Sequence, residues 1–245
     1  MKRIAIIAVI LFIFSAFSVS YGQDSIKATH RNFLTELNVN LFQGQLSLSN
    51  ALNQVKFRYF TSDNSALRIG FTVDAKSLVD DAKNVYGTNP TNSSDKRTST
   101  LIGINLGFEH HFRGTKRLSP YIGGEFTFGI KSAKHVKESN GVKTTIKGAW
   151  QSTEYYNSGY SYSAYNTERA FVSYGLNMIT GFDFYVARNF FIGYEMQFGF
   201  TNKSYSDLEV TSTGGSQGST YPDYDSSEFS FGPRIINGIR VGYVF

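Results

Sequence analysis

The chain has 245 residues, a formal net charge of +5, no cysteine, four prolines and a high content of Tyr (16) and Phe (22). Without cysteine it has no disulfide, no thiolate metal site and no lipid anchor on cysteine. A balance this weakly basic, with no stripe rich in Lys and Arg, argues against nucleic acid as a partner. The length suits one or two soluble domains or one barrel, and the composition favours a β-rich protein.

The first 22 residues have the pattern of a secretory signal peptide. Lys2-Arg3 gives a positive start, residues 4–17 are almost wholly apolar, and Ser20-Tyr21-Gly22 is a cleavage site of the small-x-small type. We expect a mature chain that begins at Gln23, with cleavage after Ser20 as the alternative. The apolar run is shorter than the ~20 residues that a membrane-spanning helix needs. No later run reaches that length, so residence in a membrane would depend on strands.

After a polar stretch at 23–32, which predicts a short periplasmic lead-in, apolar residues alternate with small or polar ones in repeated segments. This period-2 pattern is that of a strand with two unlike faces. The eight segments are 33–41, 55–60, 67–74, 102–112, 122–130, 172–186, 190–200 and 235–245.

The connections between these segments alternate in length. Three are short, at 62–65, 113–119 and 187–189, and the four between them are long. The long ones are 43–53, 76–98, 132–168 and 203–226. Short periplasmic turns and long extracellular loops alternate in this way in outer-membrane barrels. We therefore predict an all-β fold, an eight-stranded antiparallel up-and-down transmembrane β-barrel over residues 33–245.

The glycines predict which face points inward. Twelve of them fall on the polar face, and only Gly124 falls on the apolar face. An eight-stranded barrel is just wide enough for side chains to fill, so its inward face must be partly small. The bulky apolar face would then contact lipid. A soluble lipocalin-like barrel with an apolar interior is the alternative, and a mature protein that stayed in buffer without detergent would support it.

Three stretches carry a resemblance to a known family: residues 55–70, Gly181–Val186 with Gly193-Tyr194-Glu195, and the terminal Gly242-Tyr243-Val244-Phe245. Over about residues 30–245 the chain resembles the outer-membrane β-barrel domain family. These are small eight-stranded porin-like proteins of Gram-negative bacteria, similar in architecture to outer membrane proteins A and X. The resemblance implies residence in the cell outer membrane, with membrane lipid and lipopolysaccharide as partners, and it implies no activity.

The resemblance also implies that the barrel-assembly machinery reads the terminal aromatic strand as its signal. The residues of this signal are Ile239, Val241, Tyr243 and Phe245. The alternative is that they belong only to the barrel wall, and the two roles are compatible.

Charged residues of both signs fall on the predicted inward face. The acids are Glu36, Glu109, Glu125, Asp183 and Glu195, and the bases are Lys56, Arg58, Arg68, Arg234 and Arg240. Because an unpaired buried charge costs several kcal/mol, we expect an ion-pair network that plugs the lumen. In it, Arg234 and Arg240 would pair with Glu109, Glu125 or Glu195. A gate or a weak ion path is the alternative.

One predicted loop is rich in aromatic residues among Ser, Asn and Gly, a composition typical of recognition surfaces. These candidates for binding an extracellular ligand are Trp150, Tyr155, Tyr156, Tyr160, Tyr162 and Tyr165. The alternative is a variable surface loop that binds nothing.

Catalytic signals are poor. The chain has no H-E-x-x-H, P-loop or G-x-S-x-G motif, and the adjacent His110 and His111 must face opposite ways. We therefore expect no enzyme, no cofactor and no metal site. The function predicted is that of an integral outer-membrane protein with a structural or surface-interaction role. The alternative is a narrow porin or transporter for small or hydrophobic solutes.

Overall fold

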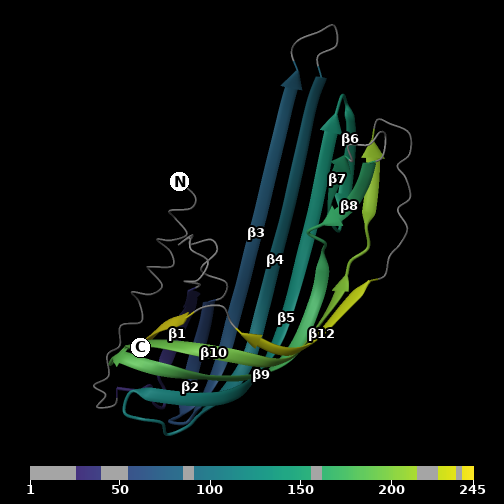
Figure 1. Cartoon of the computed structure of the whole chain (residues 1–245). Helices are drawn as coiled ribbons and strands as arrows, with labels where there is room; N and C mark the ends of the chain where they lie inside the picture. Colours follow the sequence, from purple (N-terminus) through teal and green to yellow (C-terminus); the bar gives the residue numbers. More distant parts are fainter. Residues whose placement is uncertain (1–25, 40–54, 85–90, 156–161, 214–225, 236–238) are drawn as a thin grey trace.

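A computed structural model describes residues 26–39, 55–84, 91–155, 162–213, 226–235 and 239–245 (Figure 1). The predicted signal peptide at 1–22 lies outside these residues. No helix of the described residues is long and apolar enough to cross a membrane. The strands are β1 (Phe33–Val39), β2 (Val55–Ser62), β3 (Ser65–Asn84), β4 (Thr91–His111), β5 (Leu118–Ser139), β6 (Val142–Lys147), β7 (Trp150–Tyr155), β8 (Tyr162–Thr167), β9 (Phe171–Ala187), β10 (Phe190–Tyr205), β11 (Glu209–Thr213), β12 (Ser227–Ile235) and β13 (Ile239–Val244).

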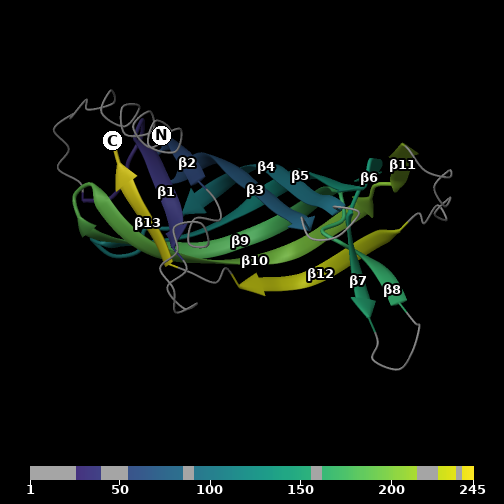
Figure 2. The same ribbon diagram turned by 90° about the horizontal axis from the view of Figure 1, so that it is seen from above.

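Eight strands close into a ring. The order is β1, β2, β3, β4, β5, β9, β10 and then β12 with β13, which pairs back to β1, and every neighbouring pair is antiparallel. β12 and β13 act as one interrupted strand, because β10 pairs with β13 over 190–193 and with β12 over 196–204. Figure 2 shows β9, β10 and β12 running along one side of the ring and β3, β4 and β5 along the other. The prediction of an all-β, antiparallel ring of eight strands is confirmed.

The two faces of the ring differ as the alternation predicts. Large apolar residues on the outer face are exposed, as Leu106, Phe126 and Leu176 illustrate, whereas charged residues on the inner face are buried. Inward glycines make room for these side chains. A Cβ at Gly107 would lie 3.0 Å from Arg68 Cγ, and one at Gly242 would lie 2.1 Å from Phe191 Cζ. Bulky inward side chains such as those of Arg68 and Phe191 therefore fit because a glycine on a neighbouring strand leaves space for them.

One end of the ring, which we call the turn end, carries the short connections between β2 and β3, β4 and β5, and β9 and β10. Residues 26–32 lie across this end. Arg31 N donates to Phe60 O at 2.9 Å, and His30 N donates to Asp63 Oδ1 at 3.0 Å. Ala28 packs into a buried cluster with Leu34, Phe60, Ala66, Tyr185, Phe191 and Val244. The segment predicted as a lead-in therefore closes the turn end together with an apolar layer.

At the opposite end, most of the predicted long loops are strands. β3 and β4 pair without interruption from Ser65/His110 to Asn84/Thr91 and form the long hairpin of Figure 1. β5 also continues past the ring, and β6 and β11 add to its edge. We call this sheet the extension: β3 from Ala75, β4 up to Ser99, β5 from Ser132, and β6 with β11. The predicted loops at 76–98 and 132–168 were therefore wrong over much of their length, and the one at 203–226 was wrong over 203–205 and 209–213. Residues 214–225 and the whole of 43–53 lie outside the described residues.

Candidate functional site

A cluster of charged side chains fills the middle of the ring, and every strand of the ring contributes to it. The cations are Lys56 and Arg58 on β2, Arg68 on β3 and Arg240 on β13; the carboxylates are Glu36 on β1, Glu109 on β4, Glu125 on β5, Asp183 on β9 and Glu195 on β10. All nine are at most 4% exposed. We call these nine residues the charge cluster.

Arg58 joins three carboxylates from three strands. Its Nη1 lies 2.7 Å from Asp183 Oδ2 and 3.0 Å from Glu109 Oε2, and its Nη2 lies 3.0 Å from Glu36 Oε2. The guanidinium also lies over the ring of Phe191, 4.9 Å from its centroid. Arg58 therefore connects the charge cluster to the apolar layer at the turn end.

Arg68, the direct cross-strand neighbour of Arg58 on β3, likewise joins carboxylates from three strands. Its Nη1 lies 2.8 Å from Glu109 Oε1 and 2.9 Å from Glu195 Oε2. Its Nη2 lies 2.8 Å from Glu125 Oε2, an ion pair whose angles are not those of a hydrogen bond. Glu109 thus receives one arginine on each of its oxygens.

Arg240 and Lys56 complete the set. Arg240 donates to Glu36 Oε2 at 2.9 Å and to Asp183 Oδ1 at 2.7 Å. Lys56 Nζ donates to Glu195 Oε1 at 3.0 Å. Because each cation contacts at least two carboxylates on different strands, the charge cluster ties the strands together across the lumen.

Two further side chains, which the sequence did not single out for this role, belong to the same network. Tyr121 donates its hydroxyl to Glu195 Oε2 at 2.7 Å. His111 is buried, with Nε2 3.1 Å from Glu109 Oε2 and Nδ1 3.0 Å from Ser119 Oγ. Their inward parity could have identified them, because both lie an even number of residues from Glu109 or Glu125 on β4 and β5.

Arg234 is the one predicted member that the structure does not bring into the charge cluster. Its Nη2 donates to Ser230 Oγ at 2.9 Å, and among the described residues it forms no ion pair with the other nine. Arg240 pairs chiefly with Glu36 and Asp183 and lies 3.8 Å from Glu195. The expected pairing of Arg234 with Glu109, Glu125 or Glu195 is therefore corrected, because β12 holds Arg234 too far along the ring axis.

Four of the six candidate recognition residues lie on strands β7 and β8. Trp150 is buried against Ala133 and Ala170, and its Nε1 donates to Thr98 O at 2.9 Å. Its predicted role on an exposed surface is thus wrong, because it anchors the base of the β7–β8 hairpin. The backbones of Tyr155, Tyr162 and Tyr165 lie in paired positions of this hairpin, whereas Tyr156 and Tyr160 lie outside the described residues.

The residues of the predicted assembly signal lie at the end of the ring wall. Tyr243 is 46% exposed on the outer face of β13, in register with Thr35 of β1 and Phe190 of β10. Phe245 follows the strand, and its ring lies 4.9 Å from that of Tyr243 and 6.2 Å from that of Phe33. Ile239 and Val241 share the face of Tyr243.

A second polar group lies in the extension, at the base of the β7–β8 hairpin. Asp95 accepts from Arg97 Nε at 2.8 Å and lies 2.9 Å from His135 Nε2, while Gln151 N donates to His135 Nδ1 at 3.0 Å. Partial burial raises the pKa of Asp95, but hydrogen bonds from Arg97 and His135 outweigh it and the pKa is lowered. Burial lowers the pKa of His135, against the attraction of Asp95.

Among the described residues, no group of three or more His, Asp or Glu side chains is placed to hold a metal ion.

No family model matches the chain, and no curated protein matches it. Among solved structures, the chain matches the crystal structure of CarO from Acinetobacter baumannii at 9% identity and a TM-score of 0.30, over 89% of this chain and 99% of that one. The geometry of this chain defines a class: a closed antiparallel ring of eight strands, charged inside and apolar outside.

Proposed function

We propose that this chain is an integral outer-membrane β-barrel protein whose lumen is closed, with a structural or surface-interaction role and no enzymatic activity. The observation that carries the proposal is that charged residues are buried inside the ring and large apolar residues are exposed around it. This is the reverse of the arrangement in a water-soluble protein. A continuous apolar belt of this kind is not stable in water. In a bilayer, a closed ring also leaves no unpaired backbone edge within the hydrocarbon.

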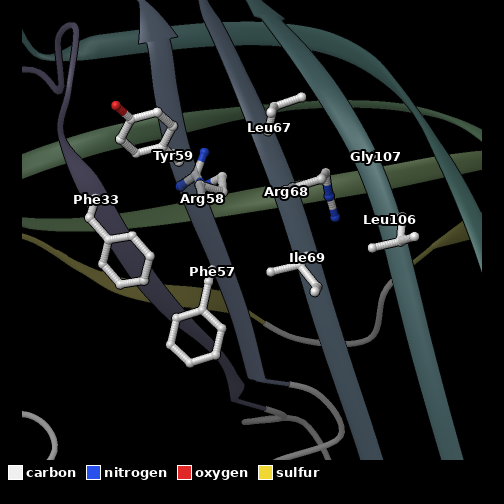
Figure 3. A pocket seen from close by; sticks show the side chains of 9 residues that line it. All are labelled: Phe33, Phe57, Arg58, Tyr59, Leu67, Arg68, Ile69, Leu106 and Gly107. Atoms are coloured by element: carbon white, nitrogen blue, oxygen red, sulfur yellow. The ribbon is translucent and has the colours of Figure 1, made fainter.

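The dimensions of the belt support residence in a membrane. Along β4 and the residue that follows it, the outward side chains are mostly apolar from Ile102 to Phe112, which at ~3.3 Å per residue and a strand tilt of ~40° spans about 25 Å. Lipid-facing bands of outer-membrane barrels are about 25 Å tall. Figure 3 shows part of this face, where Phe33, Phe57, Tyr59, Leu67, Ile69 and Leu106 line a groove of about 340 Å³. In a bilayer, acyl chains would fill such a groove.

The charge cluster supports a closed barrel rather than a pore. Its members come from all eight strands and meet across the lumen, with the apolar layer of Phe60, Tyr185 and Phe191 next to it at the turn end. An ion entering from either side would have to break several buried ion pairs, each of which is costly to separate. The role is therefore proposed to reside outside the lumen.

The extension is the surface available for such a role. β3 from Ala75 to Asn84 continues beyond the apolar belt for about 30 Å along the strand, at ~3.3 Å per residue. Its side chains are mostly Ser, Thr, Lys, Asp and Asn. We propose that this sheet contacts extracellular ligands and lipopolysaccharide. We propose further that the barrel-assembly machinery recognises Ile239, Val241, Tyr243 and Phe245.

Conductance in planar bilayers tests the closed lumen. The protein is refolded into lipid vesicles, its folding is checked by the shift in electrophoretic mobility between unheated and boiled samples, and single channels are recorded. We expect no stable conductance steps. Stable, large steps from the folded form would replace the closed-barrel proposal with the porin or transporter alternative.

A further inference from the structure

A second cavity, of about 600 Å³, opens on the outer face of the extension immediately above the apolar belt. β4, β5 and β6 form one side of it, and the segment from Ser206 to Glu209 forms the other. In Figure 2 β6 and β11 lie together at the end of the ring remote from the C-terminus. The cavity is separate from the charge cluster and from the groove of Figure 3.

The outer face changes its chemistry within three rows of side chains at this cavity. The lowest row contains Ile102, paired with Ile130, and both are exposed. The next contains Thr100 paired with Ser132, and the next contains Thr98 paired with Lys134. A lipid whose acyl chains covered Ile102 and Ile130 would therefore place its headgroup against hydroxyls and then against a lysine.

Two lysines are held opposite each other at the cavity. Lys134 on β5 is the direct cross-strand partner of Lys147 on β6, so both side chains point to the same face. Like charges directly opposite one another destabilise a sheet. Lys147 has a compensating partner, because its Nζ lies 3.0 Å from Glu209 Oε2. Among the described residues, Lys134 forms no ion pair.

The opposite wall is fixed close to the lysines by backbone contacts. Gly148 N donates to Ala133 O at 2.9 Å, Ala170 N donates to Gly148 O at 2.7 Å, and Ser206 N donates to Ala170 O at 3.0 Å. Gly148 has φ +94°, and a Cβ there would lie 2.4 Å from Asp207 O. Only glycine fits this position without strain, and it allows the backbone of Asp207 to approach closely. Asp207 and Glu209 both line the cavity.

We propose that this cavity binds the phosphorylated sugar headgroup of a lipid in the outer leaflet. Lys134 would bind the phosphate as a charge-assisted donor, and Thr98, Thr100 and Ser132 would hydrogen-bond to phosphate or sugar oxygens. Asp207 and Glu209 would accept from sugar hydroxyls. The volume lies within the range of ligand sites. The inference rests on the proposed residence in the outer membrane, and it specifies where and by which residues a glycolipid is bound.

The test measures the binding of purified diphosphorylated lipid A to the full mature chain in detergent micelles by native mass spectrometry. The variants are Lys134→Gln and, as a matched control, Lys96→Gln; Lys96 is an exposed outward lysine on β4, one row above, and does not line the cavity. Loss of one charge-assisted contact should weaken binding by about tenfold or more in Lys134→Gln. The control should bind like the wild type.

Further ligands separate the possible sources of the phosphate. Dephosphorylated lipid A should bind weakly, with no difference between Lys134→Gln and wild type, and inorganic phosphate should not compete with lipid A at millimolar concentration. Equal loss in both variants, or full competition by inorganic phosphate, would overturn the inference. If the chain folds in detergent and inserts in vesicles but shows no effect of Lys134, this inference fails and the proposed function stands. If the chain does not insert, both fail.

Discussion

The interior of the ring and the extension above it both hold a buried histidine beside a carboxylate, but the two histidines have different partners. Inside the ring, the nitrogens of His111 face Glu109 Oε2 and Ser119 Oγ, and both of these oxygens can accept a hydrogen bond. In the extension, His135 faces Asp95 with one nitrogen and the N–H of Gln151 with the other. At the second site the N–H of Gln151 requires an unprotonated Nδ1 on His135, a constraint that the partners of His111 do not impose.

The difference reflects how each region is closed. The charge cluster has partners on every strand of the ring, so its charges compensate one another without solvent. The hairpin of β7 and β8 is docked by a few contacts at one end, chiefly Trp150 and the hydrogen bond from Gln151 to His135. We infer that the ring stays stable unless a buried charge loses its partner. Docking of the β7–β8 hairpin, by contrast, is weakened by protonation of one histidine, His135.

The largest effect is expected from breaking the charge cluster. Arg240→Met should lower the free energy of unfolding by about 3–5 kcal/mol, because it removes the cation that pairs with Glu36 and Asp183 and leaves their buried charge undercompensated. Urea titrations in micelles measure this. Glu209→Gln, at an ion pair in which both side chains are more than half exposed, should lower the stability by no more than about 1 kcal/mol. Equal effects of the two variants would show that the ion pairs of the charge cluster are not buried away from water.

A smaller effect is expected from filling the space above an inward glycine. Gly242→Ala would place a Cβ 2.1 Å from Cζ of the buried Phe191 ring and should cost about 1–3 kcal/mol. Gly103→Ala is the matched control, because its nearest neighbour would be Thr72 Cβ at 3.4 Å, an ordinary contact. The same urea titration compares them. A Gly103→Ala variant as unstable as Gly242→Ala would contradict the proposed packing.

The smallest and most local effect is expected from acid. The groups facing His135 are Asp95 and Arg97 on β4, Lys137 on β5 and Gln151 on β7. Because docking of the hairpin lowers the pKa of His135, docking is fully stable above the ordinary value of about 6.5 and weakens as the pH falls through the lowered pKa. Protonation of Nδ1 removes its hydrogen bond from Gln151 N.

Trp150 is the only tryptophan of the chain, so its fluorescence reports on the docked hairpin directly. Its emission should shift to longer wavelength on acidification, with a midpoint below pH 6.5, and the shift should be absent in His135→Gln. A shift of the same size and midpoint in that variant would remove His135 from the explanation.

Much of the ring could be predicted because its outer residues are large and apolar, which makes the alternation readable. Strand parity then placed nine charged residues correctly on the inward face. Their partners could not be predicted, because the alternation gives the face on which a residue lies but not the register between neighbouring strands. Arg234 has the right parity, but β12 places it beside Ser230, several residues from Arg240 along the axis.

The extension could not be predicted for the opposite reason. Between Ala75 and Asn84 both faces of β3 are polar or small apart from Leu78 and Val79, so no stripe distinguishes a strand from a loop. This part of β3 pairs with β4 because the two strands are already paired within the ring and continue in the same register. For Trp150, composition suggested a recognition surface, whereas its contacts with Ala133 and Ala170 depend on where β5 leaves β9.

Accessibility of single nitroxide labels in lipid vesicles tests the central claim most directly, and the absence of cysteine makes each label unique. Labels at Leu176 on the outer face, at Asn105 on the inner face and at Ser77 in the extension would be compared for collision with oxygen and with a water-soluble nickel chelate. We predict that Leu176 is reached by oxygen and not by nickel, Asn105 by neither, and Ser77 by nickel. A label at Leu176 that nickel reaches as readily as it reaches Ser77 would contradict the membrane-embedded barrel.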